Sequence, residues 1–506
     1  MTGDPSGYVV AVDQGTSSTK AIALDSSGST IAETGRRVAQ SHPRPGWVEQ
    51  NPMEIADSVE AVLAELVDAI GTEPAAVGLS CQRESALAWD SRTGEPVSPV
   101  LGWQDRRTAG RAIELRTGQM GERVRWLSGL PIDPMFSALK FEWILDRYDP
   151  DRSLASSGRI TLGTVDAWLA HRLTGTRRIE LGNASRTQLL DIRTAAWSDE
   201  LLDVFRVPRA ALPEITASDD CVSMGATTLA AVLGDSHAAL FGHGVRTSGS
   251  VKATYGTGSS VMGLSEGEGT TADGVVDTIA WSIAGRIARA FEGNILAAGA
   301  TLVWLSELLG VGPAELAALG QTTDAGGVTI VPAFAGLGAP WWDEAAVGLV
   351  TGVTLGTSAG QLARAALDAI VLQVEDVISA AEQSSATGAV LRVYVDGGPT
   401  ENTWLMQHQA NISGRRILRP ARPALSALGA AWLAGAGVGL WDPDIPPWSE
   451  NSAEEFLPIW PQSSREERMV QWAAALARSR LTVDGPSWDQ PSEESAQVNS
   501  VSGRIT

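Results

Sequence analysis

The sequence predicts an α/β protein built from two similar halves. Apolar strands alternate with amphipathic helices along the chain, which is typical of this class. An apolar strand, a turn of Gly, Thr and Ser, and a second strand occur in residues 9–25 and again in residues 250–264. We therefore expect the motif to have been used twice, with the two turns facing each other across a central cleft.

The length and composition also favour more than one domain. A chain of 506 residues is too long for one ordinary core, and 44% hydrophobic residues are enough for two. We place the first domain at residues 1–246 and the second at residues 247–480. Residues 481–506 are rich in Ser, Pro and acidic residues, so we expect a disordered tail.

The charge and the cysteines exclude several classes of protein. A net charge of −21 argues against nucleic acid or a membrane surface as a partner, since both require a basic face. Cys81 and Cys221 form neither a disulfide framework nor a metal-ligand spacing. The first residues lack the pattern of a signal peptide. We expect a cytoplasmic protein.

Helical and strand periods define the elements of the first half. After the first strand pair, more strand sequence runs to about residue 50, and residues 51–71 then predict a helix that ends at Gly71. Its apolar stripe has helical spacing and consists of Ile55, Val59, Val62, Leu63, Leu66, Val67 and Ile70. Residues 75–90 read as a strand, a polar turn and another strand.

The second half repeats this alternation after its hairpin. Residues 358–383 predict a long helix, residues 391–398 a strand that ends in Gly-Gly, and residues 426–439 a helix of small residues.

The two turns are typical of phosphate binding. In the first turn the strand ends at Asp13, and the residues that follow have small side chains that let backbone N–H groups approach phosphate oxygens. Asp13 would hold Mg²⁺ there, directly or through water. An ordinary surface hairpin is the alternative, but the second turn, residues 254–260, weakens it.

Two more strand ends carry candidate residues. The strand to Asp396 leads into Gly397 and Gly398, where a base or ribose could lie against the backbone with Asn402 in reach. No P-loop motif occurs. Asp235 ends another strand, either as a helix cap or as a carboxylate that takes a hydroxyl proton.

The chain resembles the FGGY family of carbohydrate kinases. The matching segments run in family order from about residue 8 to residue 440 and include DQGTSSTKAIALD, PRPGWVEQNPMEI, CQRESALAWD, LGWQDRRT, IDPMFSALKFEWILD, LGTVDAWLAHRLTG, NASRTQLLDI, TYGTGSS, VPAFAGLGAPWWD, DGGPTENTWLMQHQANI and SALGAAWLAGAGVG. The resemblance implies two actin/hexokinase-like (ribonuclease H-like) domains around a catalytic cleft, with ATP and Mg²⁺ as cofactors.

The resemblance also implies a role for each matching residue. The nucleotide positions are Thr16, Ser17, Ser18, Lys20, Thr257, Gly299, Gly398 and Asn402. Asp13 and Asp235 match the metal positions, and Asp235 is also the catalytic base. The acceptor positions are Arg83, Glu84, Trp103, Met135, Asp235, Ser236 and Ser260.

The acceptor pocket departs from the family's glycerol-phosphorylating members, which the chain otherwise resembles most. Those members usually carry Tyr at Met135, Gln at Ser236, Gln at His237 and Phe at Ser260. A pocket that hydrogen-bonds the hydroxyl groups of its substrate discriminates strongly between substrates, so these four differences bear on the identity of the acceptor. We expect glycerol as the best single choice, with a larger polyol or ketose as the alternative. Val303 replaces a common glutamine on the nucleotide side, and the Gly-Arg loop of some bacterial members is missing.

The expected reaction is transfer of the γ-phosphoryl group of ATP to a primary hydroxyl of a small polyol. The alternative from another class is an actin-like ATPase switch, whose ATP consumption would not depend on an added polyol. Relatives often form homodimers or homotetramers, so we expect either.

Overall fold

The computed structural model describes residues 7–116, 118–266, 274–383, 387–448 and 453–481. Apart from its first residue, the predicted tail lies outside these ranges. Within them no single helix is long and apolar enough to span a bilayer, and α10 (Gly299–Leu309) and α11 (Pro313–Gln321) reach that measure only as a pair bent by 98°.

Two large mixed sheets form the framework, and their strand orders correspond. The first sheet has the order β13-β14-β5-β1-β2-β3. Its strands are β1 (Val9–Gln14), β2 (Ser18–Leu24), β3 (Thr30–Arg37), β5 (Ala76–Cys81), β13 (Val222–Met224) and β14 (Thr227–Gly234). The antiparallel hairpin β1–β2 continues into β3, while β5 and β14 run parallel on the other side of β1.

The second sheet repeats this plan in the order β17-β18-β16-β15-β21-β22-β23. Its strands are β15 (Ser250–Tyr255), β16 (Ser259–Ser265), β17 (Val276–Ile283), β18 (Arg286–Ile295), β21 (Arg392–Asp396), β22 (Arg416–Arg419) and β23 (Glu454–Phe456). Hairpin β15–β16 is antiparallel and continues into β18, and β21 and β22 run parallel beside β15. The internal repeat predicted from the two hairpins is therefore confirmed at the level of topology.

Smaller sheets and helices complete the first half. The four-stranded sheet β4-β7-β6-β8 and two strand pairs consist of β4 (Glu49–Gln50), β6 (Ala86–Asp90), β7 (Val100–Leu101), β8 (Ile160–Thr164), β9 (Arg178–Glu180), β10 (Leu190–Asp191), β11 (Ala196–Trp197) and β12 (Glu214–Thr216). The helices are α1 (Pro52–Ile70), α2 (Ala109–Arg116), α3 (Met120–Ser128), α4 (Ser137–Tyr148), α5 (Ser153–Ser156), α6 (Val165–Thr174), α7 (Leu181–Ser185), α8 (Asp199–Val204), η1 (Arg209–Ala211) and α9 (Asp235–Gly242).

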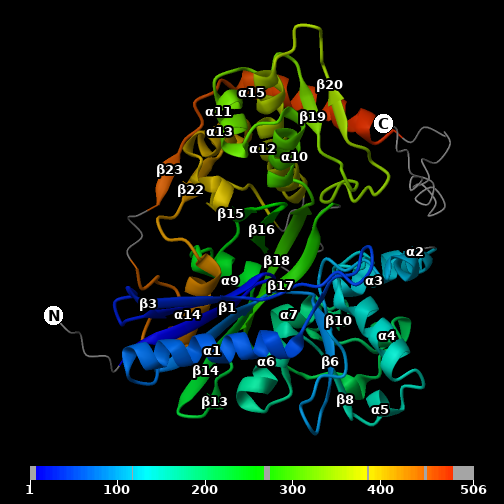
Figure 1. Cartoon of the computed structure of the whole chain (residues 1–506), viewed down its shortest axis with the longest axis vertical. Coiled ribbons are helices and arrows are strands. Elements are labelled where there is room, and N and C mark those ends of the chain that lie inside the picture. Colours follow the sequence, from blue (N-terminus) through cyan, green and yellow to red (C-terminus); the bar gives the residue numbers. More distant parts are fainter. Residues whose placement is uncertain (1–6, 117, 267–273, 384–386, 449–452, 482–506) are drawn as a thin grey trace, which may run out of the picture.

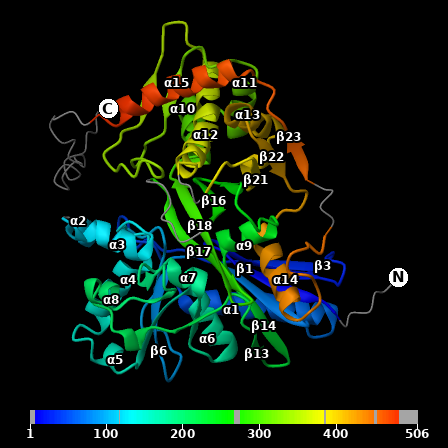
Figure 2. The same cartoon turned by 180° about the vertical axis from the view of Figure 1, so that it is seen from behind.

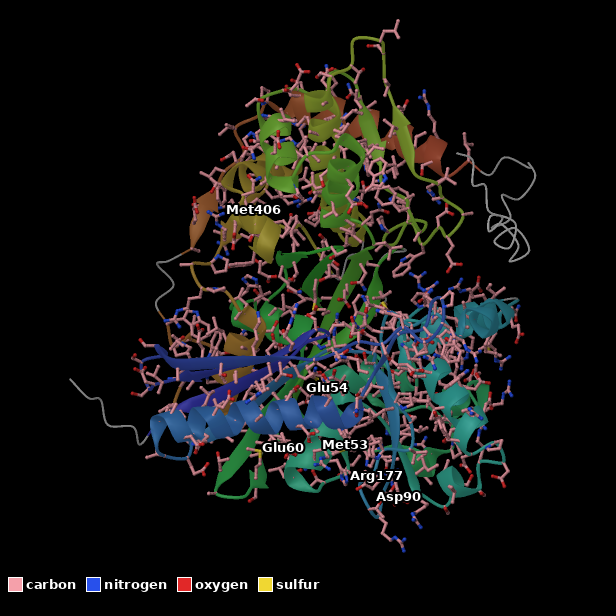
Figure 3. All side chains as sticks on the ribbon, viewed as in Figure 1. Met53, Glu54, Glu60, Asp90, Arg177 and Met406 are labelled. Carbon is pink, nitrogen blue, oxygen red and sulfur yellow. The ribbon has the colours of Figure 1, made fainter. Side chains whose placement is uncertain are left out.

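The predicted helix at residues 51–71 is confirmed as α1. The side chain of Asn51 caps its N-terminus by accepting from Met53 N, and Gly71 ends it with φ 86°. Glu54 and Glu60 lie along α1, whereas Met406 belongs to the other half of the molecule (Figure 3).

The second half is built around a long buried helix. Besides the pair β19 (Thr329–Val331) and β20 (Leu349–Thr351), it contains α10, α11, α12 (Ala359–Ala381), η2 (Gly398–Glu401), α13 (Thr403–Ser413), α14 (Leu425–Gly437) and α15 (Gln462–Ser479). Helix α12 packs on the second sheet, where its apolar side chains join those of β15 and β21 in one core. Helices α10, α12, α13 and α15 lie together at the upper end of the molecule in Figure 1.

Two segments from the second half of the sequence cross to the first half. Helix α14 packs against α9, β1 and β5, and both views show it beside the first sheet (Figures 1 and 2). Hairpin β17–β18 also contacts the first half along its strands, through Asp277 N, which donates to Gly129 O at 3.0 Å, and Arg289 Nη1, which donates to Ile192 O at 2.6 Å. The boundary near residue 246 stays a prediction; it falls in the connection between α9 and β15.

The crossing of α14 requires a close approach of two backbones. A β-carbon at Gly429 would collide with the carbonyl oxygen of Ala238 in α9. Gly429 is buried within α14, so the neighbouring backbone has no solvent space into which to move.

We predict that Gly429→Ala lowers the free energy of unfolding by about 1–3 kcal/mol, because the added methyl group overpacks this crossing. Gly110→Ala is the matched control, since Gly110 lies in α2 and an added β-carbon meets nothing within 4 Å. It should stabilise α2 by about 0.5–1 kcal/mol through helix propensity. Thermal unfolding of both variants measures the difference, and equal melting temperatures would contradict the packing argument.

Candidate active site

The first predicted phosphate turn lies between β1 and β2. Gly15 N donates to Ser18 O at 2.9 Å and closes the turn, with Ser17 exposed at its tip. The hydroxyl of Thr16 accepts a hydrogen bond from Trp103 Nε1 at 3.1 Å. The turn therefore touches a side chain that the sequence assigned to the acceptor pocket.

Asp13 lies in β1 immediately before this turn. Its register partners are Lys20 on β2 and Ser80 on β5, so all three side chains share one face of the sheet. Ser80 Oγ donates to Asp13 Oδ1 at 2.8 Å. Burial raises the pKa of Asp13 to about 6, the Ser80 hydrogen bond opposes this rise, and the negative charge of Asp235 adds to it. The charge of Asp235 thus reaches Asp13 across the site.

The second turn borders a large cavity. Gly256 N donates to Gly258 O at 2.8 Å, and Thr257 O accepts from Ala300 N at 3.0 Å at the start of α10. A β-carbon at Gly299 would lie 2.6 Å from Gly256 O, so only glycine lets α10 begin this close to the turn.

The larger cavity has a volume of about 900 Å³. Its lining brings together the predicted nucleotide residues of the second half, Thr257, Gly299, Gly398 and Asn402, with Val303. Asn402 caps α13, its Oδ1 accepting from Leu405 N at 3.1 Å. Its amide nitrogen is therefore the group left for a ligand in this cavity. The remaining wall is mostly apolar, as expected where a base binds.

Asp235 is the first residue of α9 and follows β14 directly. Gly234 occupies the N-cap position, so the prediction of Asp235 as the N-cap residue is wrong, although its carboxylate does accept from an N–H of the first helical turn. The Asp235 side chain is 40% exposed and its Oδ1 accepts from Arg83 Nε at 3.1 Å and from Ser236 N at 2.6 Å. A carboxylate that is fixed on one oxygen and open to solvent suits proton transfer.

A smaller cavity of about 200 Å³ extends from Asp235 toward the predicted nucleotide residues. It is lined by Asp235, Ser236, Lys252, Asp396 and Gly397 among others, and Gly397 precedes Gly398 of the larger cavity. Burial lowers the pKa of the Lys252 ammonium group, and the carboxylates of Asp396 and Glu292 oppose this effect.

Arg83 and Glu84 are both buried, and each has an ionic partner. The Arg83 guanidinium donates to both oxygens of Glu292, from Nη1 at 3.0 Å and from Nη2 at 2.6 Å. Arg186 Nε donates to Glu84 Oε1 at 2.6 Å, and its Nη2 lies 2.9 Å from Glu292 Oε2. Burial alone would raise the pKa of Glu292, but Arg186 and Arg83 hold it well below its usual range.

The backbone at Glu84 is in the left-handed region, with φ 62°. Two donors hold its carbonyl oxygen in this conformation: Ser137 Oγ at 3.0 Å and Lys140 Nζ at 3.3 Å. Lys140 is fully buried, and burial lowers its pKa to about 8. A strained backbone with dedicated support at this position is typical of functional sites.

The other predicted acceptor residues lie around this group. Met135 packs against the small apolar cluster that contains Phe136. Trp103 is partly exposed and donates a hydrogen bond to the first turn. Ser260 Oγ lies 3.4 Å from Lys252 Nζ.

His237 is buried on α9, and in the described part of the chain neither of its ring nitrogens has a hydrogen-bond partner. Burial, and then the charge of Arg83, keep its pKa well below the usual value, so it is neutral.

Sequence reasoning missed four residues of this site: Lys140, Arg186, Lys252 and Glu292. Lys140 and Arg186 lie in quoted family segments, but the segments alone do not say which charged residues become buried. A signal was present, since Lys140 and Lys252 are two of the chain's three lysines and both interrupt apolar runs. Glu292 had no comparable signal, because its partners lie more than 100 positions away.

Family models cover both halves of the chain. The N-terminal domain model of the FGGY family of carbohydrate kinases matches residues 8–243, and the C-terminal domain model of that family matches residues 251–438.

Curated relatives match over most of the chain. The sequence is 43% identical over 450 residues to a glycerol kinase of Paraburkholderia phytofirmans, covering 86% of this chain and 90% of that relative. It is 44% identical over 453 residues to a glycerol kinase of Burkholderia cenocepacia, with the same coverage of 86% and 90%.

Solved structures share the fold. The crystal structure of Plasmodium falciparum glycerol kinase with ADP matches with a TM-score of 0.89 and 25% identity, over 94% of this chain and 99% of that chain. A ligand-bound xylulose kinase from Lactobacillus acidophilus matches with a TM-score of 0.85 and 21% identity, over 94% and 99% of the two chains. The expected pair of actin/hexokinase-like domains is confirmed, and the chain belongs to the FGGY family of carbohydrate kinases.

Proposed function

We propose that the chain transfers the γ-phosphoryl group of ATP to a primary hydroxyl of glycerol and forms glycerol 3-phosphate. The observation that carries the proposal is the position of Asp235, which contacts Arg83 on the acceptor side at 3.1 Å and lines the cavity that reaches Gly397 on the nucleotide side. The curated relatives named glycerol kinase support glycerol as the acceptor.

The nucleotide would occupy the larger cavity, with its phosphates between the two turns. Thr16, Ser17, Ser18 and Lys20 would contact the phosphates from the first half, and Thr257 and Gly299 from the second. The base and ribose would lie near Gly398 and Asn402. Residues 1–246 would thus supply the acceptor pocket and the first phosphate turn, and residues 247–480 the nucleotide pocket.

Asp13 and Asp235 would hold Mg²⁺ together with the phosphate oxygens. Mg²⁺ in such sites is bound by one or two carboxylates and by the substrate phosphates, and in the described residues no group of three or more Asp, Glu, His or Cys side chains is placed to hold a metal ion. The raised pKa of Asp13 fits this assignment, because a nearby cation would compensate its burial. When bound, the ion neutralises charge on the phosphates.

The acceptor would be oriented before transfer. Arg83 and Glu84 would hydrogen-bond two hydroxyl groups, Trp103 and Met135 would form the walls, and Ser236 and Ser260 would line the remaining side. Asp235 would accept the proton of the third hydroxyl group as the oxygen of that hydroxyl attacks the γ-phosphoryl group. Fixed positions of the two substrates supply most of the rate enhancement in this class of reaction.

The remaining expectations belong to the same proposal. The enzyme is expected in the cytoplasm, as a homodimer or homotetramer, without a nucleic acid or membrane partner. These expectations follow from the sequence and the family.

An assay of ADP release tests the proposed activity. With ATP and Mg²⁺, ADP should form only when an acceptor is added, and kcat/KM should be highest for glycerol among glycerol, tetritols, pentitols and ketopentoses. Met135, Ser236 and Ser260 are smaller than the Tyr, Gln and Phe usual at these positions, so tetritols are the alternative acceptors whose kcat/KM should come nearest to that of glycerol. A higher kcat/KM for a larger acceptor would reassign the substrate, and ADP release without an acceptor would favour the ATPase switch.

Two aspartate variants serve as controls for this assay. Asp235→Asn should lower kcat by about 10²–10⁴-fold, the usual contribution of a general base, while ADP binding is retained. Asp57→Asn makes the same change at an exposed position of α1 and should leave kcat unchanged. Full turnover by Asp235→Asn would remove the base assignment.

The pKa of Asp13 predicts a pH dependence. Below about pH 6 its carboxyl group becomes protonated and can no longer bind the cation, so kcat/KM for ATP should fall. Because Mg²⁺ competes with the proton, a higher Mg²⁺ concentration should move the midpoint of this fall to lower pH. Rate profiles at two Mg²⁺ concentrations measure the shift, and a midpoint independent of Mg²⁺ would contradict the role of Asp13.

A further inference from the structure

A series of buried ion pairs includes two of the residues proposed to bind the acceptor. Glu292 on β18 is fully buried and contacts two arginines, Arg83 and Arg186. Arg186 in turn contacts Glu84. Arg186 and Glu292 are thus joined to each other, and each also holds one of the two residues assigned to the acceptor hydroxyls.

From this arrangement we infer that Arg186 and Glu292 are a positioning pair for acceptor binding. The inference rests on the proposed function, because it takes Arg83 and Glu84 as the groups that bind the acceptor.

The hydrogen-bond inventory of Arg83 supports this role. A guanidinium has five N–H groups in a fixed plane, and three are used, two by Glu292 and one by Asp235. One N–H on each terminal nitrogen remains for an acceptor hydroxyl. The bidentate contact with Glu292 fixes the plane in which these two N–H groups point.

Glu84 is held in a corresponding way. Its Oε1 accepts from Arg186 Nε, and Oε2 has no recorded hydrogen-bond donor in the described part of the chain. The second oxygen is thus the acceptor that a substrate hydroxyl can use. Its direction depends on Arg186, whose own position depends on Glu292.

Loss of the Glu292 charge would change the positions of the two arginine side chains. Arg83 and Arg186 would then be two buried cations that share no carboxylate, and such charges seek other partners. The nearest carboxylate for Arg83 is Asp235, at 3.1 Å. A shift of the guanidinium toward Asp235 would misplace the acceptor hydroxyls and occupy the base.

Steady-state kinetics of Glu292→Gln test the inference, with ATP, Mg²⁺ and glycerol as substrates. We expect kcat/KM for glycerol to fall by about 10²-fold, the effect of a displacement of about 1 Å in a reacting group, with a raised KM for glycerol. The KM for ATP should stay within about twofold, because no nucleotide residue contacts the pair.

Glu375→Gln is the matched control. Glu375 is also buried in the second half and pairs with an arginine, Arg415, at 2.8 Å, but it lies on α12, away from both cavities. It should cost stability without changing either KM. If Glu292→Gln kept the wild-type constants, or if both variants raised the KM for glycerol equally, the positioning role would be overturned.

A second variant decides the question if Glu292→Gln does not fold, as judged by its melting transition and ADP binding. Arg186→Lys keeps the buried positive charge but removes the Nε donor to Glu84, so it should raise the KM for glycerol and leave the KM for ATP unchanged. An unchanged KM for glycerol would contradict the inference. Failure of the proposed function is a separate result, since the wild-type enzyme would then show no glycerol-dependent ADP release.

Discussion

The site depends on the buried guanidinium of Arg83, which is shared between Glu292 on the second sheet and Asp235 at the start of α9. Charges removed from water must be paired closely, or they destabilise the protein by several kcal/mol each. This requirement fixes the relative position of a strand from the second half and a helix from the first. The residues proposed to bind the acceptor therefore take their geometry from both halves of the chain.

The rest of the architecture brings two copies of one hairpin to the same place. Each sheet presents the turn of its central hairpin at the end of a strand, with Asp13 before the first turn and Thr254 at the corresponding position of the second. The apolar core that includes α9 and α14 contains residues of both sheets. Packing thus holds the sheets together, while the polar groups at the turns are left for ligands.

Much of the fold and part of the site follow from local sequence. The period of α1, its Asn51 cap and Gly71 are local features, and the repeated hairpin is visible because the same turn chemistry occurs twice. The series of buried ion pairs that joins Arg83, Glu292, Arg186 and Glu84 could not be predicted in this way. Pairing of Arg186 with Glu292 depends on how distant strands meet, and sequence alone also gives no reason for α14 to pack on the opposite sheet.

The central claim is that nucleotide and acceptor meet at Asp235, between the two turns. The most direct measurement is a crystal structure of the protein with ADP, Mg²⁺ and glycerol. The account predicts ADP in the cavity lined by Thr257 and Asn402, and glycerol with two hydroxyls on Arg83 and Glu84 and the third within hydrogen-bond distance of Asp235. Glycerol bound elsewhere, or ADP phosphates directed away from Asp13 and Asp235, would contradict it.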